Sequence, residues 1–315
     1  MPGPRAEEAA ERAHLARIVK EVAGDAQLGR IERLRGGVDA LTHAVQLRRG
    51  GGPAEWLVVR RWKAQTLTWN PTAPERVWTT LHLLERHGVP APRPIYLDAA
   101  GALVGEPTLV MTRAPGRATL SPADRGTYVR ELGAALAAVH SLSVDADVVL
   151  PRDAIPDLEA LTEPGGKLAG ADGPALLERL LRWRPQHERL GLVHGDYWAG
   201  NTLWRDGRLT SIVDWDQAAL GDPHADVGYC RVDLALMFGL EAADEFLAAY
   251  AHAMGSEPPT GGLGFWDLLA AVRALPDGSP WMPGYLDLGR TDLDVSTLQA
   301  RLSQFIAKTL RAGLS

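Results

Sequence analysis

Residues 192–226 read LVHGDYWAGNTLWRDGRLTSIVDWDQAALGDPHAD, and this stretch decides both the fold and the chemistry that we expect of the chain. In its middle, Asp206-Gly207 separates two short apolar runs. An Asp-Gly pair between apolar runs is the strongest short-range signal for a β-hairpin with a two-residue turn. We therefore predict a hairpin in which Arg205 faces Arg208.

The predicted hairpin brings two oxygen-bearing side chains together. Counting back from the turn places Asn201 opposite Ile212, and Asp214 then lies two residues further along on the same face. Diagonal neighbours on one face of an antiparallel pair are roughly 7 Å or less apart at Cβ. An amide oxygen and a carboxylate that converge in this way suit Mg²⁺, which prefers hard oxygen ligands. Asn201 and Asp214 are therefore candidate metal ligands.

Asp196 lies five residues before Asn201, in a loop where Gly195 and Gly200 suit an irregular backbone path. A carboxylate beside a divalent cation can accept a proton from a hydroxyl while the metal stabilises phosphate charge. Clusters of Asp, Gly and Asn are also common in ordinary turns. The order of these residues and the hairpin geometry favour a catalytic site.

Length and composition restrict the class of protein. The chain has 315 residues, 46% of them hydrophobic, which is enough for one large unit or two smaller ones. The most apolar long segment, residues 234–254, contains three carboxylates, so we predict no membrane span. The N-terminal residues lack the apolar stretch of a secretion signal, and Cys230 is the only cysteine. We expect a cytoplasmic protein, either a monomer or a homodimer.

The charge of the chain argues against a nucleic-acid partner. The formal net charge is −6, whereas proteins that neutralise phosphates carry clustered Lys and Arg. Residues 1–112 hold 15 basic and 12 acidic side chains, and residues 113–315 hold 18 and 27. Two interpretations fit this asymmetry equally well. One is ordinary variation in surface composition; the other is a basic half that meets phosphates and an acidic half that attracts a cationic partner.

Hydrophobic periodicity changes character near residue 113. Up to that point, short strands interrupted by glycines alternate with helical patterns at 6–22 and 76–87. Beyond it, helical spacing recurs at 123–141, 174–184, 231–254 and 295–311. We therefore expect an α+β chain with a sheet-rich N-terminal lobe (1–112), a hinge (113–117) and a mainly helical C-terminal lobe (118–315).

His194-Gly195-Asp196, followed by Asn201 and thirteen positions later by Asp214, resembles the aminoglycoside phosphotransferase family, a branch of the protein-kinase-like fold. Residues 221–226, GDPHAD, resemble the segment that follows the family's metal site, and weaker matches extend over most of the chain. The resemblance implies a two-lobe kinase fold with a nucleotide-binding N-terminal lobe. It also implies an ATP- and Mg²⁺-dependent kinase that transfers the γ-phosphoryl group to the hydroxyl of a small molecule.

The resemblance implies roles for residues in the segment 192–226, which we call the catalytic block. Asp196 would orient and deprotonate the acceptor hydroxyl. Asn201 and Asp214 would hold the Mg²⁺ ions that bridge the ATP phosphates. His194 and Asp226 would support the loop of residues 194–200, which we call the catalytic loop.

The resemblance also extends to the nucleotide. The backbone of Met111 to Arg113 would bind the adenine, and the loop around Gly36 and Gly37 would cover the phosphates. Kinases place a Lys on the third strand, where this chain has Arg60, and the two side chains are not interchangeable. The nearest candidate for the partner glutamate of that position is Glu75, about two residues earlier than the family spacing suggests.

The sequence does not decide the chemical class of the acceptor. The acidic C-terminal half suits a polycationic aminoglycoside or a basic peptide antibiotic, whereas tryptophans near the catalytic block suit a macrolide or another ring system. By the resemblance, Trp266 and Trp281 would lie in the acceptor pocket. A metabolite such as choline, homoserine or a sugar is an equal alternative. The substitution at Arg60 also leaves open a kinase-like binding or regulatory protein without phosphoryl transfer.

Overall fold

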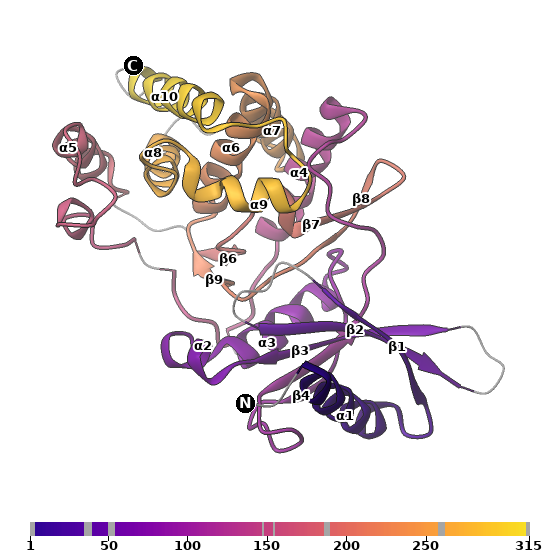
Figure 1. The fold of residues 1–315 in the computed structure, drawn as a ribbon. Coiled ribbons are helices and arrows are strands. Elements are labelled where there is room, and N and C mark those ends of the chain that lie inside the picture. The colour runs from indigo at the N-terminus through magenta and orange to yellow at the C-terminus, as the bar shows by residue number, and fades with distance from the viewer. Residues whose placement is uncertain are drawn as a thin grey trace. The chain divides into compact units, whose positions relative to one another are not determined.

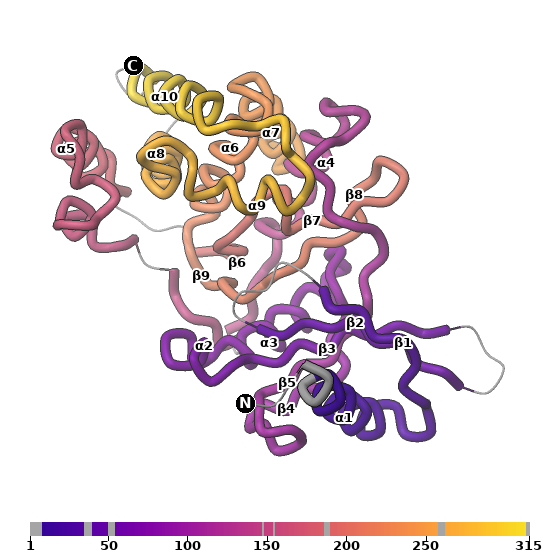
Figure 2. Tube along the Cα trace, viewed as in Figure 1, coloured from indigo at the N-terminus to yellow at the C-terminus, as the bar shows by residue number. Residues whose placement is uncertain are grey.

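A computed structural model describes residues 4–34, 40–49, 54–146, 148–153, 155–185, 190–257 and 262–312, with side chains from Glu8 onward in the first helix. The chain forms two compact units, residues 1–114 and 115–315, which we describe one at a time (Figures 1 and 2). Gly36 and Gly37, predicted to cover the phosphates, lie outside the described residues. Across these described ranges, no helix is both long enough and apolar enough to cross a membrane.

The first unit is built on an antiparallel sheet. Over the described residues the sheet has five strands in the order β1-β2-β3-β5-β4. The strands are β1 (Gln27–Arg33), β2 (Ala40–Arg48), β3 (Glu55–Trp62), β4 (Pro94–Asp98) and β5 (Thr108–Thr112), and the helices are α1 (Pro4–Ala23), α2 (Ala64–Trp69) and α3 (Ala73–Arg86).

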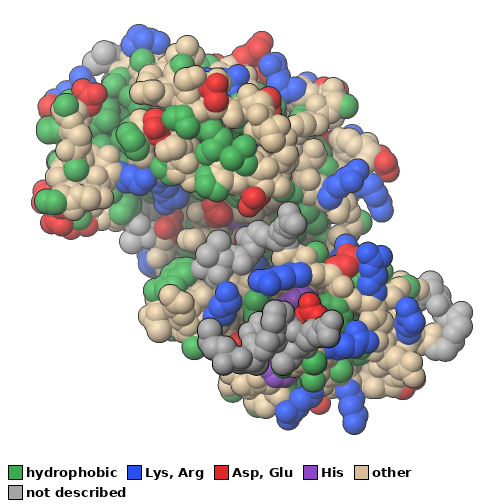
Figure 3. Space-filling model, in the orientation of Figure 1, with side chains coloured by type: hydrophobic (Ala, Val, Ile, Leu, Met, Phe, Trp, Pro, Cys, Tyr) green, Lys and Arg blue, Asp and Glu red, His purple; other side chains and the backbone are tan. Residues whose placement is uncertain are grey.

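The core of the first unit lies between α1 and one face of this sheet (Figure 1). Leu15, Ile18 and Val19 recur at helical spacing along α1, and all three are buried. They belong to one cluster with Val59 of β3 and Val110 of β5. The helix predicted at 6–22 is confirmed. On the face drawn in Figure 3, Lys and Arg stand out among the charged side chains of this unit.

The second unit is mainly helical. Its helices are α4 (Arg125–His140), α5 (Gly173–Trp183), α6 (His224–Phe238), α7 (Leu240–Ala253), α8 (Leu263–Arg273), α9 (Met282–Asp287) and α10 (Val295–Ala312). Two short antiparallel pairs, β6 (Gly191–Val193) with β9 (Ala219–Gly221) and β7 (Thr202–Arg205) with β8 (Arg208–Ile212), carry the catalytic block. Single 3₁₀ turns are η1 (Ala160–Thr162), η2 (Ala199–Asn201) and η3 (Ser279–Trp281).

The single helix predicted at 231–254 is wrong, because the structure has two helices there. Gly239 separates α6 from α7 with a φ of +96°, a conformation that only glycine adopts without strain. In addition, α6 begins at His224, directly after Pro223, which is seven residues earlier than predicted.

The hairpin has the predicted turn but not the predicted register. Asp206 and Gly207 both have positive φ angles, 53° and 75°, as a two-residue type I′ turn requires. Arg205 pairs with Arg208 as expected, but a bulge between Leu203 and Trp204 shifts the pairs beyond it by one residue. Thr202 therefore faces Ile212, and the carbonyl of Asn201 accepts from Val213 N at 2.9 Å. The prediction that Asn201 lies opposite Ile212 is corrected accordingly.

The bulge has an identifiable cause in Thr210. Its hydroxyl lies 2.6 Å from the carbonyl oxygen of Pro115 and 3.0 Å from that of Leu203. These contacts hold Thr210 out of the ladder of paired residues, since a bulge leaves one residue unpaired. The side chains that follow Thr210 are thereby offset by one position relative to a regular hairpin.

Candidate active site

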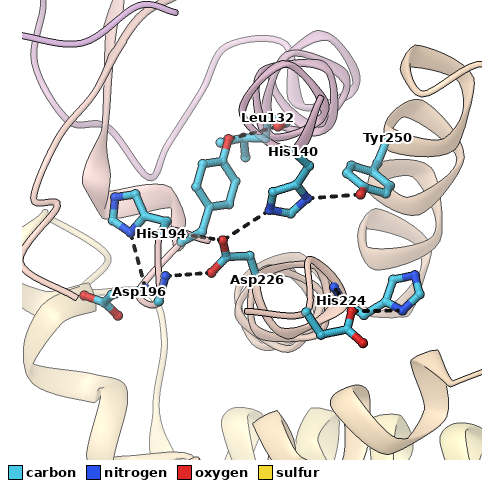
Figure 4. Close-up of polar contacts among 10 residues, drawn as sticks. Leu132, His140, His194, Asp196, His224, Asp226 and Tyr250 are labelled. Carbon is cyan, nitrogen blue, oxygen red and sulfur yellow. Dashed lines mark hydrogen bonds and ion pairs between the residues drawn. The ribbon is translucent and has the colours of Figure 1, made fainter. Parts of the chain in front are cut away.

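Asp226, in the first turn of α6, anchors the start of the catalytic loop (Figure 4). Its buried carboxylate accepts hydrogen bonds from the backbone nitrogens of His194 (2.6 Å) and Gly195 (2.9 Å). It also lies 3.3 Å from Nε2 of His140. One carboxylate thus holds two consecutive peptide groups, which fixes the direction in which the loop leaves β6.

His140 and Tyr250 extend this anchor into the helices. His140, in the last turn of α4, has Nδ1 3.0 Å from the hydroxyl of Tyr250 on α7, and Figure 4 shows its ring between Tyr250 and Asp226. Burial by itself would raise the pKa of Asp226, but the hydrogen bond and charge of His140 and the backbone N–H of His194 hold that pKa below its usual value. Asp226 is therefore an ionised buried carboxylate with donors on both oxygens.

His194 is buried inside the loop, and its ring nitrogens bond to the loop itself. Its Nε2 lies 2.9 Å from the carbonyl oxygen of Val213, and its Nδ1 lies 3.3 Å from the backbone nitrogen of Asp196. A neutral ring with its proton on Nε2 satisfies both contacts, because a carbonyl only accepts and a backbone N–H only donates. The ring also packs on Trp215, with centroids 4.4 Å apart. His194 therefore connects the residue before Asp214 to the backbone of Asp196.

Asp196 is the half-buried carboxylate of the loop, and Asn201 holds it. The side-chain nitrogen of Asn201 donates to the backbone oxygen of Asp196 at 2.9 Å and to its carboxylate Oδ2 at 3.0 Å. Burial raises the pKa of Asp196, and the charge of Asp214 raises it further. The hydrogen bonds from the hydroxyl of Tyr229 and from Asn201 act in the opposite direction. The structure thus brings Asp196, Asn201 and Asp214 within electrostatic reach of one another.

Asp214 follows β8 and has a φ of +66°, in the left-handed region that Asp and Asn adopt more readily than most residues. This local turn, together with the bulge at Thr210, replaces the simple alternation from which its position was predicted. Among the described residues, the two hydrogen bonds of the Asn201 side chain to Asp196 use Nδ2 and neither uses its oxygen. An amide oxygen and a carboxylate suit a hard cation such as Mg²⁺.

The rest of the coordination sphere of such a cation has to come from outside this pair. Over the described part of the chain, no group of three or more His, Cys, Asp or Glu side chains is arranged to hold a metal ion. Mg²⁺ commonly binds through one or two protein ligands plus water and substrate phosphates. The donor set of Asn201 and Asp214 fits this mode of binding and does not fit a metal site made by protein alone.

A second buried carboxylate supports the far end of the loop. Asp233 of α6 accepts from the backbone nitrogen of Ala199 at 3.1 Å and from the hydroxyl of Tyr285 at 2.9 Å. Burial raises the pKa of Asp233 to about 7. Sequence reasoning did not find Asp233, Tyr229 or Tyr285. The signal was present in the spacing of Asp226, Tyr229 and Asp233 along one helix, on the side of α6 that supports the loop.

Arg60 and Arg61 lie next to each other in β3 of the first unit and face opposite sides of the sheet, because side chains alternate along a strand. Arg61 is fully buried on the α1 side, where it pairs with Glu11 and, at 3.0 Å, with Glu106. Arg60 is buried on the other side, with its guanidinium 5.6 Å from the ring centre of Trp62. Glu75 is exposed in the first turn of α3.

The residues predicted to bind the adenine, Met111 to Arg113, lie at the end of β5 and directly after it. Met111 pairs with Val58 of β3 and with Pro94 of β4. The guanidinium of Arg113 lies 4.6 Å from the ring centre of Trp56 and 2.9 Å from the carboxylate of Glu32. The backbone nitrogen of Arg113 donates to the carbonyl of Trp56 at 3.4 Å. The roles of Met111, Arg113 and Arg60 toward a nucleotide stay predictions.

Known proteins resemble this chain in both sequence and fold. The model of the phosphotransferase enzyme family matches residues 30–269. An aminoglycoside 3'-phosphotransferase of Streptomyces fradiae is 34% identical over 212 residues, which cover 60% of this chain and 75% of that protein. The mouse acyl-CoA dehydrogenase family member 10 is 28% identical over 235 residues, 64% of this chain. The chain spans only 22% of the length of that mouse protein.

Among solved structures, an amicoumacin kinase in complex with AMP-PNP, Ca²⁺ and Ami superposes with a TM-score of 0.62 at 16% identity, covering 98% of this chain and 96% of that one. This likeness concerns the fold, and it confirms the α+β, protein-kinase-like class predicted from the catalytic block. The resemblance to aminoglycoside phosphotransferases is confirmed by the family model and by the Streptomyces relative. The chain belongs to the phosphotransferase enzyme family.

Proposed function

We propose that this protein is an ATP- and Mg²⁺-dependent small-molecule kinase that transfers the γ-phosphoryl group to a hydroxyl of its substrate. The observation that carries the proposal is the contact between Asn201 Nδ2 and the carboxylate of Asp196, at 3.0 Å, on a loop fixed by Asp226. Holding a carboxylate in one orientation is what general-base catalysis requires.

Asp196 is the proposed base. The acceptor oxygen forms a bond to the γ-phosphorus while the bond from that phosphorus to the ADP oxygen breaks, and the hydroxyl proton moves to Asp196. The raised pKa of Asp196, caused mainly by burial, strengthens the carboxylate as a proton acceptor. His194 and Asp226 are positioning residues, because they bond to the loop and not to the reacting groups.

Asn201 and Asp214 are the proposed ligands of Mg²⁺, which supplies positive charge against the phosphates when it is bound. For the nucleotide, we propose the backbone of Met111 to Arg113 at the adenine, Arg60 at the phosphates and Gly36-Gly37 in a covering loop. The amicoumacin kinase complex, with its AMP-PNP and Ca²⁺, supports a nucleotide and a divalent cation in a protein of this fold.

The test is the release of ADP from Mg²⁺-ATP in the presence of a panel of hydroxyl acceptors, with Asp196→Asn as the matched variant. The variant keeps the size of the side chain but cannot accept the proton, so we expect turnover to fall by roughly 10²–10⁴-fold. Binding of ATP, measured separately by calorimetry, should be retained. Full turnover by Asp196→Asn would refute the assignment. ATP binding without turnover of any acceptor would support a kinase-like binding protein instead.

A further inference from the structure

A cavity of about 210 Å³ lies beside Asp196, wholly within the second unit. Its walls come from Asp196 and Trp198 of the catalytic loop, from Tyr229 and Asp233 of α6, and from residues 280–285. Pockets for drug-sized ligands usually measure about 300–1,000 Å³. This cavity is therefore smaller than a drug-sized pocket, and it can hold a compact group next to the proposed base.

Aromatic side chains make up four of the eight described residues that line the cavity. Tyr229 and Trp281 form one tilted pair with centroids 5.0 Å apart, and Trp198 and Tyr285 form another with centroids 6.3 Å apart. The ring of Trp198 is held by two glycines: a Cβ built on Gly200 would lie 2.3 Å from it, and one built on Gly284 3.1 Å. The ring of Trp198 is thus fixed in place by close packing.

The polar groups of the wall are largely bonded to one another. The hydroxyl of Tyr285 donates to Asp233 at 2.9 Å, and the other carboxylate oxygen of Asp233 accepts from Ala199 N. The hydroxyl of Tyr229 bonds to Asp196. A ligand rich in hydroxyl groups, such as a sugar, would find few partners here, and its buried polar groups would stay unsatisfied.

The charge of the cavity selects for a cation. Among its described lining residues there is no Lys, Arg or His, whereas Asp196 carries a carboxylate. An acceptor with a carboxylate of its own would be repelled. A cation placed over aromatic faces is attracted by their quadrupoles, and an alkylated ammonium needs no hydrogen-bond partner.

From this geometry we propose that the acceptor is a compact amino alcohol with an alkylated ammonium group, held by Trp198, Tyr229, Trp281 and Tyr285 while its hydroxyl meets Asp196. The proposal rests on the proposed kinase activity for the identity of the reacting group. The binding of the cation does not depend on turnover, so the two ideas can fail separately.

The first experiment compares two isosteric alcohols, choline and its neutral carbon analogue 3,3-dimethylbutan-1-ol. We expect choline to bind the full chain in calorimetry and to stimulate ADP release from Mg²⁺-ATP. The neutral analogue should have a kcat/KM lower by about tenfold or more, the size expected of a desolvated cation–π contact. An equal kcat/KM for the two alcohols would overturn the proposal.

A pair of tryptophan variants tests the site itself. Trp281→Leu removes one ring of the wall, so we expect the KM for choline to rise by about tenfold or more, with a smaller change in kcat. The control is Trp69→Leu, because Trp69 is 57% exposed in α2 of the first unit and takes no part in the site. Trp69→Leu should keep the parent KM, and an unchanged melting temperature of Trp281→Leu shows that its fold is intact. An unchanged KM in Trp281→Leu would count against the cavity as the acceptor site.

The possible outcomes of these experiments distinguish the proposed acceptor from the proposed kinase activity. Phosphorylation of a neutral sugar, a macrolide or a large polycation, with no binding of choline, would overturn the amino-alcohol acceptor and leave the kinase standing. Binding of choline that Trp281→Leu weakens, with no ADP release from any acceptor, would support the cation site and refute the kinase. Stimulation by choline that is lost in Asp196→Asn would support both.

Discussion

The side-chain nitrogen of Asn201 donates to both the backbone oxygen and the carboxylate of Asp196, at 2.9 and 3.0 Å. One side chain therefore orients the proposed base and, in the proposed mechanism, also supplies its amide oxygen to Mg²⁺. Removing the side chain of Asn201 should disturb both functions together.

We expect Asn201→Ala to lower kcat and to raise the Mg²⁺ concentration at half-maximal rate by about 10–100-fold, the usual effect of losing a group that supports a metal site. The measurement is the rate of ADP release as a function of Mg²⁺ at saturating ATP. Asn201→Asp serves as the comparison, because it restores an oxygen ligand but cannot donate to Asp196. Its Mg²⁺ dependence should recover more than its kcat. Equal recovery of both would show that the hydrogen bond to Asp196 is unimportant.

Asp226→Asn tests the anchor of the loop. The amide cannot accept with both of its polar atoms, so one of the two N–H groups, of His194 or of Gly195, loses its acceptor. Leaving such a buried group unsatisfied costs about 1–3 kcal/mol in the free energy of unfolding. Chemical denaturation measures this loss. Glu55→Gln, at a carboxylate in an exposed ion pair with Arg49, should stay within about 0.5 kcal/mol of the parent protein. A similar change in both variants would contradict the role of Asp226.

Asp233 predicts a pH dependence of stability. Its folded pKa is about 7, whereas the ordinary value is 3.8, because the carboxyl is buried. The folded state therefore binds the proton more tightly. The associated stability is complete below pH 3.8 and is lost as the pH rises toward 7, by at most about 4 kcal/mol. Above pH 7 the carboxyl is ionised in both states.

Asp233→Asn should remove this contribution, since an amide does not titrate. The free energy of unfolding of the variant should fall less steeply than that of the parent between pH 4 and 7 (an interval set by the two pKa values). Urea denaturation at several pH values within this interval provides the comparison. Parallel curves for the two proteins would mean that Asp233 titrates near its ordinary pKa in the folded state.

Two glycines with nearly the same backbone angle offer a matched pair of substitutions. Gly195 has a φ of +79° and Gly207 a φ of +75°. An added Cβ at Gly195 would lie 2.6 Å from the carbonyl oxygen of Gln217, whereas no atom lies within 4 Å at Gly207. We expect Gly207→Ala to cost about 1–2 kcal/mol, from the left-handed backbone alone.

Gly195→Ala should cost about 1–3 kcal/mol more than that, because the methyl group also overpacks the loop. Thermal denaturation of the two variants gives the difference. Kinase activity should decrease in Gly195→Ala only, since Gly195 adjoins Asp196 and Gly207 lies in the hairpin turn. If both variants lost the same stability, the close contact at Gly195 would have no energetic weight.

The sequence allowed the local features to be predicted better than those that depend on distant partners. The turn at Asp206-Gly207 is correct because both residues favour positive φ. The register beyond the turn was wrong because Thr210 bonds to Pro115, which is 95 residues away in the sequence. Counting residues back from the turn to assign the register takes no account of such a distant contact. The break at Gly239 was missed because the apolar pattern on its two sides looked continuous.

In the candidate site, too, local features were predicted better than contacts between residues that are distant in the sequence. Asp196, Asn201 and Asp214 were grouped by their spacing and by the resemblance to a family, and the structure places them within electrostatic reach of one another. His140 contacts Asp226, which is 86 residues later in the chain, and no local pattern indicates this contact. Asp233 and Tyr285 likewise meet only in the folded protein. Their pairing follows from how α9 packs near α6, and no local pattern encodes it.

The chain of contacts from Tyr250 through His140 and Asp226 to the catalytic loop has a consequence for thermal inactivation. This chain of contacts links the loop to α4, α6 and α7. We therefore expect the loop to unfold together with these helices and not separately. On heating, the loss of catalytic competence and the loss of helical signal from the second unit should therefore coincide. In this protein a residual-activity curve would report global unfolding of that unit, and it would serve as a direct measure of its cooperativity.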